Sequence, residues 1–515
     1  MACRSLATPD RLHRAIIVWH FRFPATIGDN QGQSATIHSG FATARPPPFG
    51  PTEPTLNSTM PPRPTEPAAP ARRIGTLDAI AIIVGLIIGS GIFKLPQLVA
   101  MNSASESVFY GIWIAGGVIS LMGALCYAEL STSYPHAGGD YHFLNRAFGP
   151  HLSFLFAWSR LAVVTSGPIA ILGFVFGDYA SNLVPLGAHS SAVYAAIAAL
   201  GFTTINLIGI RETKGVQNVL TVMEVGGVIA IIVTGLFFSG ATPAGTVQAA
   251  PAVSAVPWSA APLAMLFVLF TFGGWNDGAY ISAEVRDPRG MVRALVASLA
   301  IVTLLYLLVN YAYVRTLGLA GVASSETVAA DVLQKAFGQA GSVFISIAVA
   351  ISALTSINST IIVGARSNYA LGRDWHALRW LGQWDTRRDT PRNALLLQGA
   401  IALLLIVGSE LTGHGFQSLI DYTLPVFWFF VMMVGVGLFV LRRRDAGRTR
   451  AFSVPLYPLT PLVFIATCAF LLYSSLSYAG SGAWFGVAVV AVGAIVMLLS
   501  GTRRATANGV PPDAP

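Results

Sequence analysis

The sequence predicts an all-α polytopic membrane protein with twelve transmembrane helices. Of its 515 residues, 54% are hydrophobic and only 10% are charged. A soluble domain carries about 25% charged residues, so this chain cannot cover itself with a hydrated surface. Its apolar stretches repeatedly approach the roughly 20 residues that a helix needs to cross a bilayer core.

The expected spans begin after a tail of different composition. Residues 1–73 are rich in Pro, Thr, Ala and Arg and lack periodicity, which indicates a disordered tail. Met60 is an alternative start, so that residues 1–59 would not be translated. The twelve expected spans are 77–99, 108–131, 147–177, 190–209, 215–238, 260–284, 292–317, 338–371, 393–410, 417–441, 459–478 and 484–501.

The positions of the basic residues predict the orientation of these spans. Loops on one predicted side hold the arginine clusters at 286–293, 366–392 and 442–450, whereas the other side holds little more than Arg315 and Lys335. Cytoplasmic loops carry the excess of Lys and Arg, so both termini are expected in the cytoplasm. The net charge of +8 therefore indicates membrane topology and not a nucleic-acid partner. Arginine outnumbers lysine 28 to 3, which favours a GC-rich bacterial source and hence a cytoplasmic membrane.

Two of the expected spans contain glycine-rich interruptions. The first reads GLIIGSGIFKLP at 85–96, in which glycines and a serine are closed by Pro96. The second reads LFVLFTFGGWNDGAYISAE at 266–284, with Asn276 and Asp277 at the interruption. These breaks fall in spans 1 and 6, five helices apart. Paired interruptions at corresponding positions of two halves point to an inverted-repeat transporter with its substrate near the membrane midplane.

Such breaks suit a zwitterionic ligand. Unwound backbone in hydrocarbon costs several kcal/mol per unsatisfied group, roughly, so it persists where something polar occupies the gap. The half-helix that starts at Gly91 offers free N–H groups to a carboxylate. The half-helix that ends near Thr271 offers free carbonyls to an ammonium group. The alternative is that these glycines only permit close helix packing.

Four motifs, in order, carry a resemblance to a known family. GSGIF at 89–93 resembles the span 1 signature of the amino acid–polyamine–organocation superfamily. The stretches ALCYAELSTSYPHAGGDYHFLNRAFGP at 124–150, FTFGGWNDGAYISAEVRDP at 270–288 and GARSNYALGRD at 364–374 are similar to later motifs of its bacterial L-type amino acid transporter branch. The resemblance covers about residues 76–500.

The resemblance implies a five-plus-five inverted repeat with discontinuous helices 1 and 6 and two extra C-terminal helices. Repeat one is expected at about 77–238, repeat two at 260–441 and the extra helices at 459–501, within a transport domain at 74–502 that a cytoplasmic tail at 503–515 follows. Carried over by position, Ile87, Ser90, Gly91 and Ile92 would line the carboxylate side of the substrate. Phe270, Thr271 and Gly273 would contact the amine, with the Phe270 ring as a gate, and Asn276 would stabilise the unwound segment.

Charged residues in or near the spans are candidates for coupling. Glu224 stands where members of the group often carry a lysine. A carboxylate inside a span is costly, so Glu224 is interpreted as a proton-coupling site, as a cation-binding group or as an ion-pair partner of Arg160. Asp277 is a second coupling candidate that would face the cytoplasmic vestibule. Lys94 is expected to snorkel to the interface, and Glu129 and Glu284 to meet loop arginines.

The leading hypothesis is a secondary transporter that moves neutral amino acids by alternating access. The alternatives are a carrier of cationic amino acids or polyamines, and an amino acid sensor without turnover. The sequence contains no nucleotide loop, metal-ligand spacing or nucleophile constellation, so no enzyme activity, cofactor or metal is expected. Some L-type relatives join a single-span glycoprotein through a disulfide, but the corresponding loop here, DYASNLVPLGAHSS at 178–191, has no cysteine, so no such heavy chain is expected.

Overall fold

The computed structural model describes most of the chain beyond residue 73. The described residues are 74–89, 91–136, 138–209, 225–238, 256–282, 285–375, 378–385, 387–388, 390–413, 415–478 and 481–500. The tails at 1–73 and 503–515, together with Ser90, Glu224 and Glu284, lie outside these residues.

Nearly all of the described chain is helical, as the sequence predicts. Among the described residues, eight helices are long and apolar enough to cross a membrane, and the bent pair of α1 and α2 would make nine. The long helices are α3 (Glu106–Ser133), α5 (Pro150–Ser159) continuing into α6 (Ser166–Leu183), α7 (Ser190–Ile208), α10 (Pro288–Ser324), α11 (Val328–Asp374), α12 (Arg392–Leu411), α13 (Gly415–Arg444) and α14 (Leu459–Tyr478). Shorter apolar helices cover Val225–Phe238 and part of α15 (Ser481–Ser500). Within the described ranges, β-structure is limited to the isolated bridges Ile74–Val285 and Asp385–Thr390.

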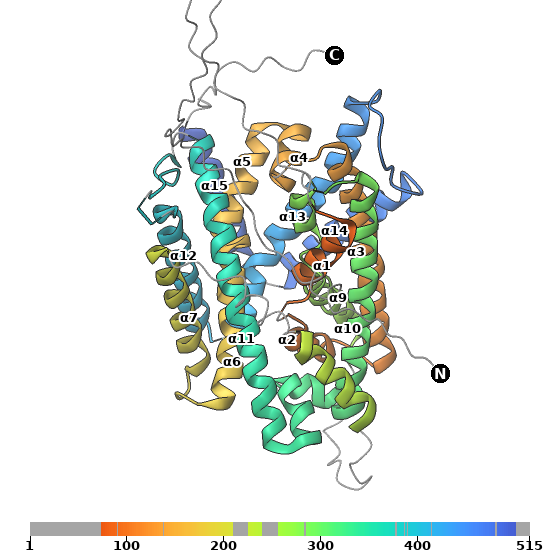
Figure 1. Cartoon of the computed structure of the whole chain (residues 1–515), viewed down its shortest axis with the longest axis vertical. Helices are drawn as coiled ribbons and strands as arrows, with labels where there is room; N and C mark the ends of the chain where they lie inside the picture. Colours follow the sequence, from red (N-terminus) through yellow and green to blue (C-terminus); the bar gives the residue numbers. More distant parts are fainter. Residues whose placement is uncertain are drawn as a thin grey trace, which may run out of the picture.

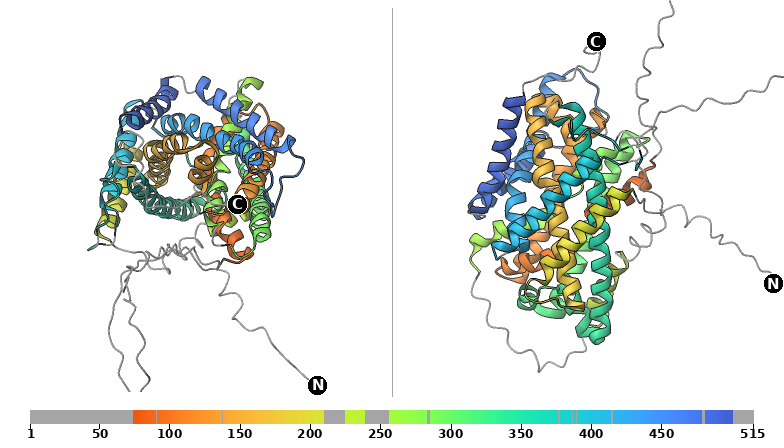
Figure 2. Two further views of the ribbon diagram at one scale, coloured as in Figure 1. Left: turned by 90° about the horizontal axis from the view of Figure 1, so that it is seen from above. Right: turned by 90° about the vertical axis from the view of Figure 1, so that its left-hand side faces the viewer.

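The helices form a bundle whose members run along its long axis at various tilts (Figure 1, Figure 2). Helices α4 (Gly139–Phe148) and α5 lie at one end of the bundle, at the top of Figure 1, and the junction of α10 and α11 lies at the other. Helix α6 packs against α7 and α11, and α10 packs against α1, α2 and α3. The buried side chains along these contacts are mostly apolar, which holds the bundle together.

The first predicted interruption divides span 1 into two helices. Helix α1 (Thr76–Ile87) and helix α2 (Gly91–Met101) meet at an angle of 51°. The chain leaves α1 through Ile88, which has extended dihedrals (φ −72°, ψ 102°). Pro96 does not close the break, because α2 continues through it to Met101. The glycine-rich segment alone therefore forms the break.

The second predicted interruption also separates two short elements. Helix α9 (Ala261–Thr271) ends at the residue that the sequence indicates, and a 3-10 helix, η5, follows at Asn276–Ile281. The connection passes through Gly274, which has a positive φ of 106°. A side chain is strained in that conformation, which explains a glycine at this position.

The long helices α10 and α11 are each divided by a glycine with non-helical dihedrals. In α10 this residue is Gly318, and in α11 it is Gly338. The expected spans 292–317 and 338–371 end and begin at these two positions. The helical segments between them form a cap at the lower end of the bundle in Figure 1.

Candidate functional site

The two broken spans touch each other at their breaks. A Cβ placed on Gly274 would lie 2.3 Å from the carbonyl oxygen of Leu86, near the end of α1. A Cβ on Gly91, the first residue of α2, would lie 3.6 Å from Cγ2 of Thr271, the last residue of α9. The four helix ends that the breaks create therefore converge at one place in the bundle.

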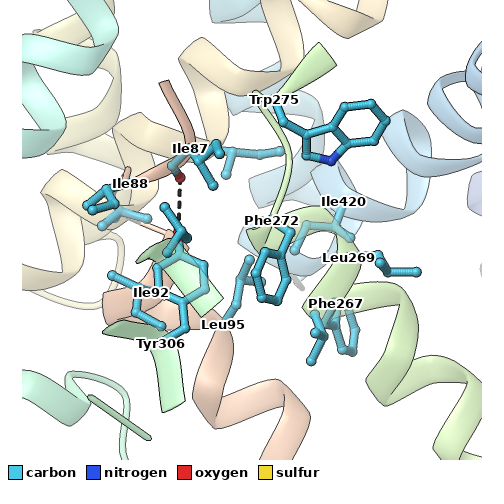
Figure 3. Close-up of a cluster of buried hydrophobic side chains, with 14 of the residues drawn as sticks. Ile87, Ile88, Ile92, Leu95, Phe267, Leu269, Phe272, Trp275, Tyr306 and Ile420 are labelled. Atoms are coloured by element: carbon cyan, nitrogen blue, oxygen red, sulfur yellow. Dashed lines mark hydrogen bonds between the residues drawn. The ribbon is translucent and has the colours of Figure 1, made fainter. Parts of the chain in front are cut away.

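A tyrosine from α10 joins the two breaks. The Tyr306 hydroxyl lies 2.9 Å from the carbonyl oxygen of Ile87 and 3.2 Å from that of Thr271, and its one hydrogen is shared between the two. Tyr306 is buried, and its ring packs edge-on against Trp113 and Phe272. Figure 3 shows Tyr306 in one cluster with Ile87, Ile92 and Phe272. A single side chain thus binds the final carbonyls of both α1 and α9.

Two further tyrosines bind the first turns of α2. Pro96 has no N–H group, so the Ile92 carbonyl lacks its helical donor four residues later. The Tyr313 hydroxyl donates to this carbonyl at 3.3 Å, and the Tyr179 hydroxyl donates to the Phe93 carbonyl at 3.0 Å. Tyr306 and Tyr313 are seven residues apart on α10, about two helical turns, so they share one face. These contacts fix α2 against α10 and α6.

The start of α2 presents the groups expected for a carboxylate. A helix leaves its first N–H groups without helical partners and carries a partial positive charge at that end. In α2 these groups belong to Gly91 and its successors, beside the end of α9. Of the expected carboxylate-side residues, Ile87 and Ile92 are buried at the break and Gly91 begins the helix, whereas Ser90 lies outside the described residues.

The end of α9 differs from the expectation of free carbonyls. Val268 accepts from the Phe272 N–H at 3.0 Å, Phe270 accepts from the Gly273 N–H at 3.0 Å, and Thr271 accepts from Tyr306. The Thr271 hydroxyl is also engaged, since it donates to the Phe267 carbonyl at 2.8 Å. Each carbonyl oxygen has two lone pairs, so an ammonium group would share these acceptors.

The remaining residues of the second break hold its shape. A Cβ on Gly273 would lie 2.9 Å from the Phe270 carbonyl oxygen, which leaves little room for a side chain. The buried Asn276 accepts a hydrogen bond from the Gly274 N–H at 3.3 Å. The Phe270 side chain is half-buried and packs at the edge of the core. A small, mainly apolar cavity beside Gly273 is lined by Ser120, Leu269, Trp275, Phe427 and Val431.

Asp277 forms an ion pair with Arg160. The distance from Oδ1 of Asp277 to Nη2 of Arg160 is 3.9 Å, and the Asp277 side chain is 42% exposed. Arg160 begins η2, a single-turn π-helix (Arg160–Val164) between α5 and α6, and such turns are frequent at functional sites. Arg160 also donates to the Tyr280 hydroxyl and lies 4.9 Å from that ring. Arg160 was one predicted partner of Glu224, which lies outside the described residues.

Lys94 does not snorkel to an interface, so that prediction is wrong. Its ammonium group is buried in an ion pair of 2.7 Å with Asp178 of α6, and it donates to the Glu326 carbonyl at 3.0 Å. The carboxylate in α6 neutralises the ammonium charge, and the carbonyl near the start of α11 accepts one of its hydrogen bonds. The Lys94 side chain therefore does not need to extend into water to stabilise its charge.

Glu129 meets arginines, as predicted, but Arg442 lies in the last turn of α13 and Arg450 in the segment that follows it. Its carboxylate is 1% exposed, receives two hydrogen bonds from Arg442 and lies 3.4 Å from Arg450. It also accepts from the Val454 N–H at 2.7 Å. Glu129 therefore joins α3 to the end of α13 and to the segment before α14.

Sequence reasoning missed Tyr306, Tyr313 and Tyr179. A tyrosine in an apolar span is interpreted as a packing residue of the core, and nothing in the sequence shows where its hydroxyl points. The signal that could have identified these residues is that a buried tyrosine hydroxyl usually has a hydrogen-bond partner. Next to two broken helices, the unsatisfied carbonyls are the obvious acceptors.

Comparisons with known proteins agree with this architecture. The family model described as "Amino acid permease" matches residues 74–504. The b(0,+)-type amino acid transporter 1 of Mus musculus is 34% identical over 78% of this chain and 82% of its own length. The serine/threonine exchanger SteT of Bacillus subtilis is 30% identical over 79% of this chain and 91% of its own length. The large neutral amino acids transporter small subunit 2 of Mus musculus is 30% identical over 83% of this chain and 79% of its own length. The chain therefore belongs to the amino acid permease family.

Proposed function

We propose that the protein is a secondary transporter that moves neutral amino acids across the cytoplasmic membrane by alternating access. The observation that carries this proposal is the contact of the two broken spans, where the start of α2 and the end of α9 meet. An N-terminal helix end and a C-terminal helix end, side by side, complement the carboxylate and the ammonium of an α-amino acid. Membership of the amino acid permease family supports the same function and gives no support to an enzyme.

The proposed architecture has twelve spans in a five-plus-five inverted repeat. Repeat one covers about 77–238, repeat two about 260–441, and α14 and α15 lie outside the repeats. The equivalent breaks in α1–α2 and α9–η5, five spans apart, support this division. That end of the bundle, with both termini, is proposed to face the cytoplasm, and the arginine-rich loops near α4 and after α13 support this orientation.

The proposed substrate contacts follow the helix ends. The carboxylate binds the first N–H groups of α2, at Ser90, Gly91 and Ile92, next to Ile87. The ammonium binds the carbonyls of Phe270 and Thr271, with Gly273 leaving room for the substrate. Phe270 closes over the bound amino acid, and Asn276 holds the loop.

A neutral substrate fits the charges better than a cationic one. Asp277, the one acidic residue in the second break, already faces Arg160. The printed names of two relatives, a serine/threonine exchanger and a large neutral amino acids transporter, favour the same substrate class.

Transport is proposed to be coupled to protons, and Glu224 and Asp277 are candidate residues for binding the coupled proton. The test is uptake of labelled serine, leucine and arginine into proteoliposomes, with and without an inward proton gradient. Gradient-dependent uptake of serine or leucine that Glu224→Gln abolishes supports symport through Glu224. Uptake unchanged in Glu224→Gln would remove that role, and the exposed Glu106→Gln is the matched control. Preferred uptake of arginine would favour the cationic carrier, and binding without uptake would favour a sensor.

No disulfide-linked heavy chain is proposed. The loop at 178–191, between α6 and α7, has no cysteine. A non-reducing gel of the protein purified from its native membrane tests this, since a covalent partner would appear as a band that shifts on reduction.

A further inference from the structure

A buried carboxyl group that the proposed coupling sites leave out lies beside the second break. Asp140 is in the first turn of α4 and is 4% exposed. The preceding Gly139 has a φ of +48°, and a Cβ there would lie 2.5 Å from the Tyr280 ring. The start of α4 is therefore pressed against η5, the element that follows the break.

Charged and polar groups surround this carboxyl. Asp277 and Asn276 face it from η5, Arg160 from η2 and the Tyr127 hydroxyl from α3. Arg160 is shared, because it also pairs with Asp277 and donates to Tyr280. Two carboxylates thus compete for one guanidinium group.

One oxygen of this carboxyl group lacks a donor. Within the described part of the chain, the buried Oδ1 of Asp140 accepts no hydrogen bond. A buried carboxylate is stabilised by donors to its oxygens, so an oxygen without a donor makes the ionised form of Asp140 costly. A proton on Asp140 removes this cost.

The charges support a proton that binds near neutral pH. Burial, and then the Asp277 carboxylate, raise the pKa of Asp140 to about 7, against the opposing effect of Arg160, Tyr127 and Asn276.

Other charged groups near α4 are engaged elsewhere. Arg444 of α13 donates to the Arg146 carbonyl, and Arg146 pairs with Asp445 at 3.4 Å. On α4 itself, His142 stacks on His136 at 4.2 Å, and burial lowers the pKa of both rings, so both are neutral at pH 7.

We propose that Asp140 is a further proton-binding residue of this transporter, and that loss of its proton to the cytoplasm opens the cytoplasmic end of the second broken span. This inference rests on the proposed transport function. In the arrangement seen here, α4, η5 and η2 close that end around a carboxyl that is neutral when protonated. When Asp140 ionises, its charge is added to that of Asp277 beside a single arginine, and separation of α4 from η5 relieves the repulsion.

The sign of the pH dependence follows from the raised pKa of Asp140. Below pH 7 the closed arrangement holds the proton, whereas a hydrated Asp140 in the open arrangement would lose it. The ratio of open to closed carrier therefore falls by up to about tenfold per pH unit below 7. Above pH 7 both arrangements are ionised and the ratio levels off.

The test uses the full chain in proteoliposomes and labelled serine as the probe. Wild-type exchange at symmetrical pH should slow several-fold from pH 7 to pH 6, and serine entry should acidify liposomes that contain a fluorescent pH indicator. Asp140→Asn should exchange serine slowly at every pH and carry no protons. The control is Asp445→Asn, because its carboxyl lies outside the cluster and has a lowered pKa, so it stays ionised in this range.

Three outcomes overturn the inference while the transport function stands. They are wild-type exchange that is independent of pH, proton movement that persists in Asp140→Asn, and an equal loss of pH dependence in Asp445→Asn.

If no amino acid is exchanged, the proposed function fails, and infrared titration of the purified protein still decides the role of Asp140. A protonated-carboxyl band that titrates near pH 7 and is missing in Asp140→Asn supports proton binding, and its presence in both proteins excludes it. If Asp140→Asn does not fold, Asp140→Glu replaces it, and an unchanged titration midpoint contradicts the assignment.

Discussion

Tyr306 of α10 donates its hydroxyl to the carbonyl of Ile87, 2.9 Å away, at the point where α1 ends. The same hydroxyl lies 3.2 Å from the Thr271 carbonyl, where α9 ends. One buried side chain therefore replaces helix hydrogen bonds that both breaks remove. This explains how two interrupted helices persist inside an apolar bundle, where an unpaired carbonyl is costly.

Tyr306→Phe should destabilise the protein and slow transport. The change leaves two buried carbonyls without this donor, at a cost of about 1–3 kcal/mol. Thermal unfolding in detergent and serine uptake in liposomes measure the two effects. Tyr311→Phe, on the exposed side of the same helix, should behave like wild type. Equal stability and uptake in both variants would show that the Tyr306 bridge is unimportant.

Gly274→Ala should abolish transport. The added Cβ would come within 2.3 Å of the Leu86 carbonyl oxygen, at a backbone φ of +106° that disfavours a side chain. The two breaks would be pushed apart. Gly85→Ala is the matched control, because a Cβ at Gly85 meets nothing within 4 Å. Wild-type uptake by Gly274→Ala would contradict the close contact of the breaks.

Removal of one partner of the Lys94–Asp178 pair should be strongly destabilising. Lys94→Met leaves the Asp178 carboxylate, 15% exposed, without its ammonium partner. Breaking a buried pair costs about 3–5 kcal/mol. Adding Asp178→Leu to Lys94→Met should restore part of the lost thermal stability, since no unpaired charge remains. The exposed His189–Glu410 pair provides the control, and Glu410→Gln should change stability by less than about 0.5 kcal/mol. A double variant less stable than Lys94→Met would contradict the pairing.

Glu129→Gln should loosen the connection between α3 and α13. The substitution removes the charge that Arg442 and Arg450 share and weakens the bond from the Val454 N–H. A loss of about 3 kcal/mol is expected for this buried site. Limited proteolysis of the segment between α13 and α14 measures the loosening directly. Glu106→Gln, at the exposed start of the same helix, should leave the proteolysis rate unchanged, and an equal rate in both variants would contradict this role of Glu129.

The breaks and the long spans could be predicted because their signals are local. Glycine clusters at 89–91 and 273–274 interrupt apolar runs, and the expected end of the first half of span 6 at Thr271 agrees with α9. The meeting of Glu129 with arginines was also predictable, since a carboxylate near a span end and an arginine-rich loop attract each other.

Contacts between distant elements could not be predicted in the same way. Lys94 reads as a snorkelling residue because its partner Asp178 is 84 positions away and only the fold brings the two together. Pro96 reads as a helix terminator, yet α2 continues because Tyr313 supplies the missing donor for Ile92. Asp140 lies in a short segment that the sequence assigns to a loop, yet it is buried, and the neighbouring Gly139 contacts Tyr280 of η5, far away in the chain.

The most direct measurement is exchange of labelled serine by proteoliposomes that contain the wild type, Gly274→Ala or Gly85→Ala. The account predicts saturable exchange by the wild type and by Gly85→Ala, competed by other neutral amino acids, and none by Gly274→Ala. Exchange by Gly274→Ala at the wild-type rate, or no exchange of any amino acid by the folded wild type, would contradict the claim that the two breaks form the transport site.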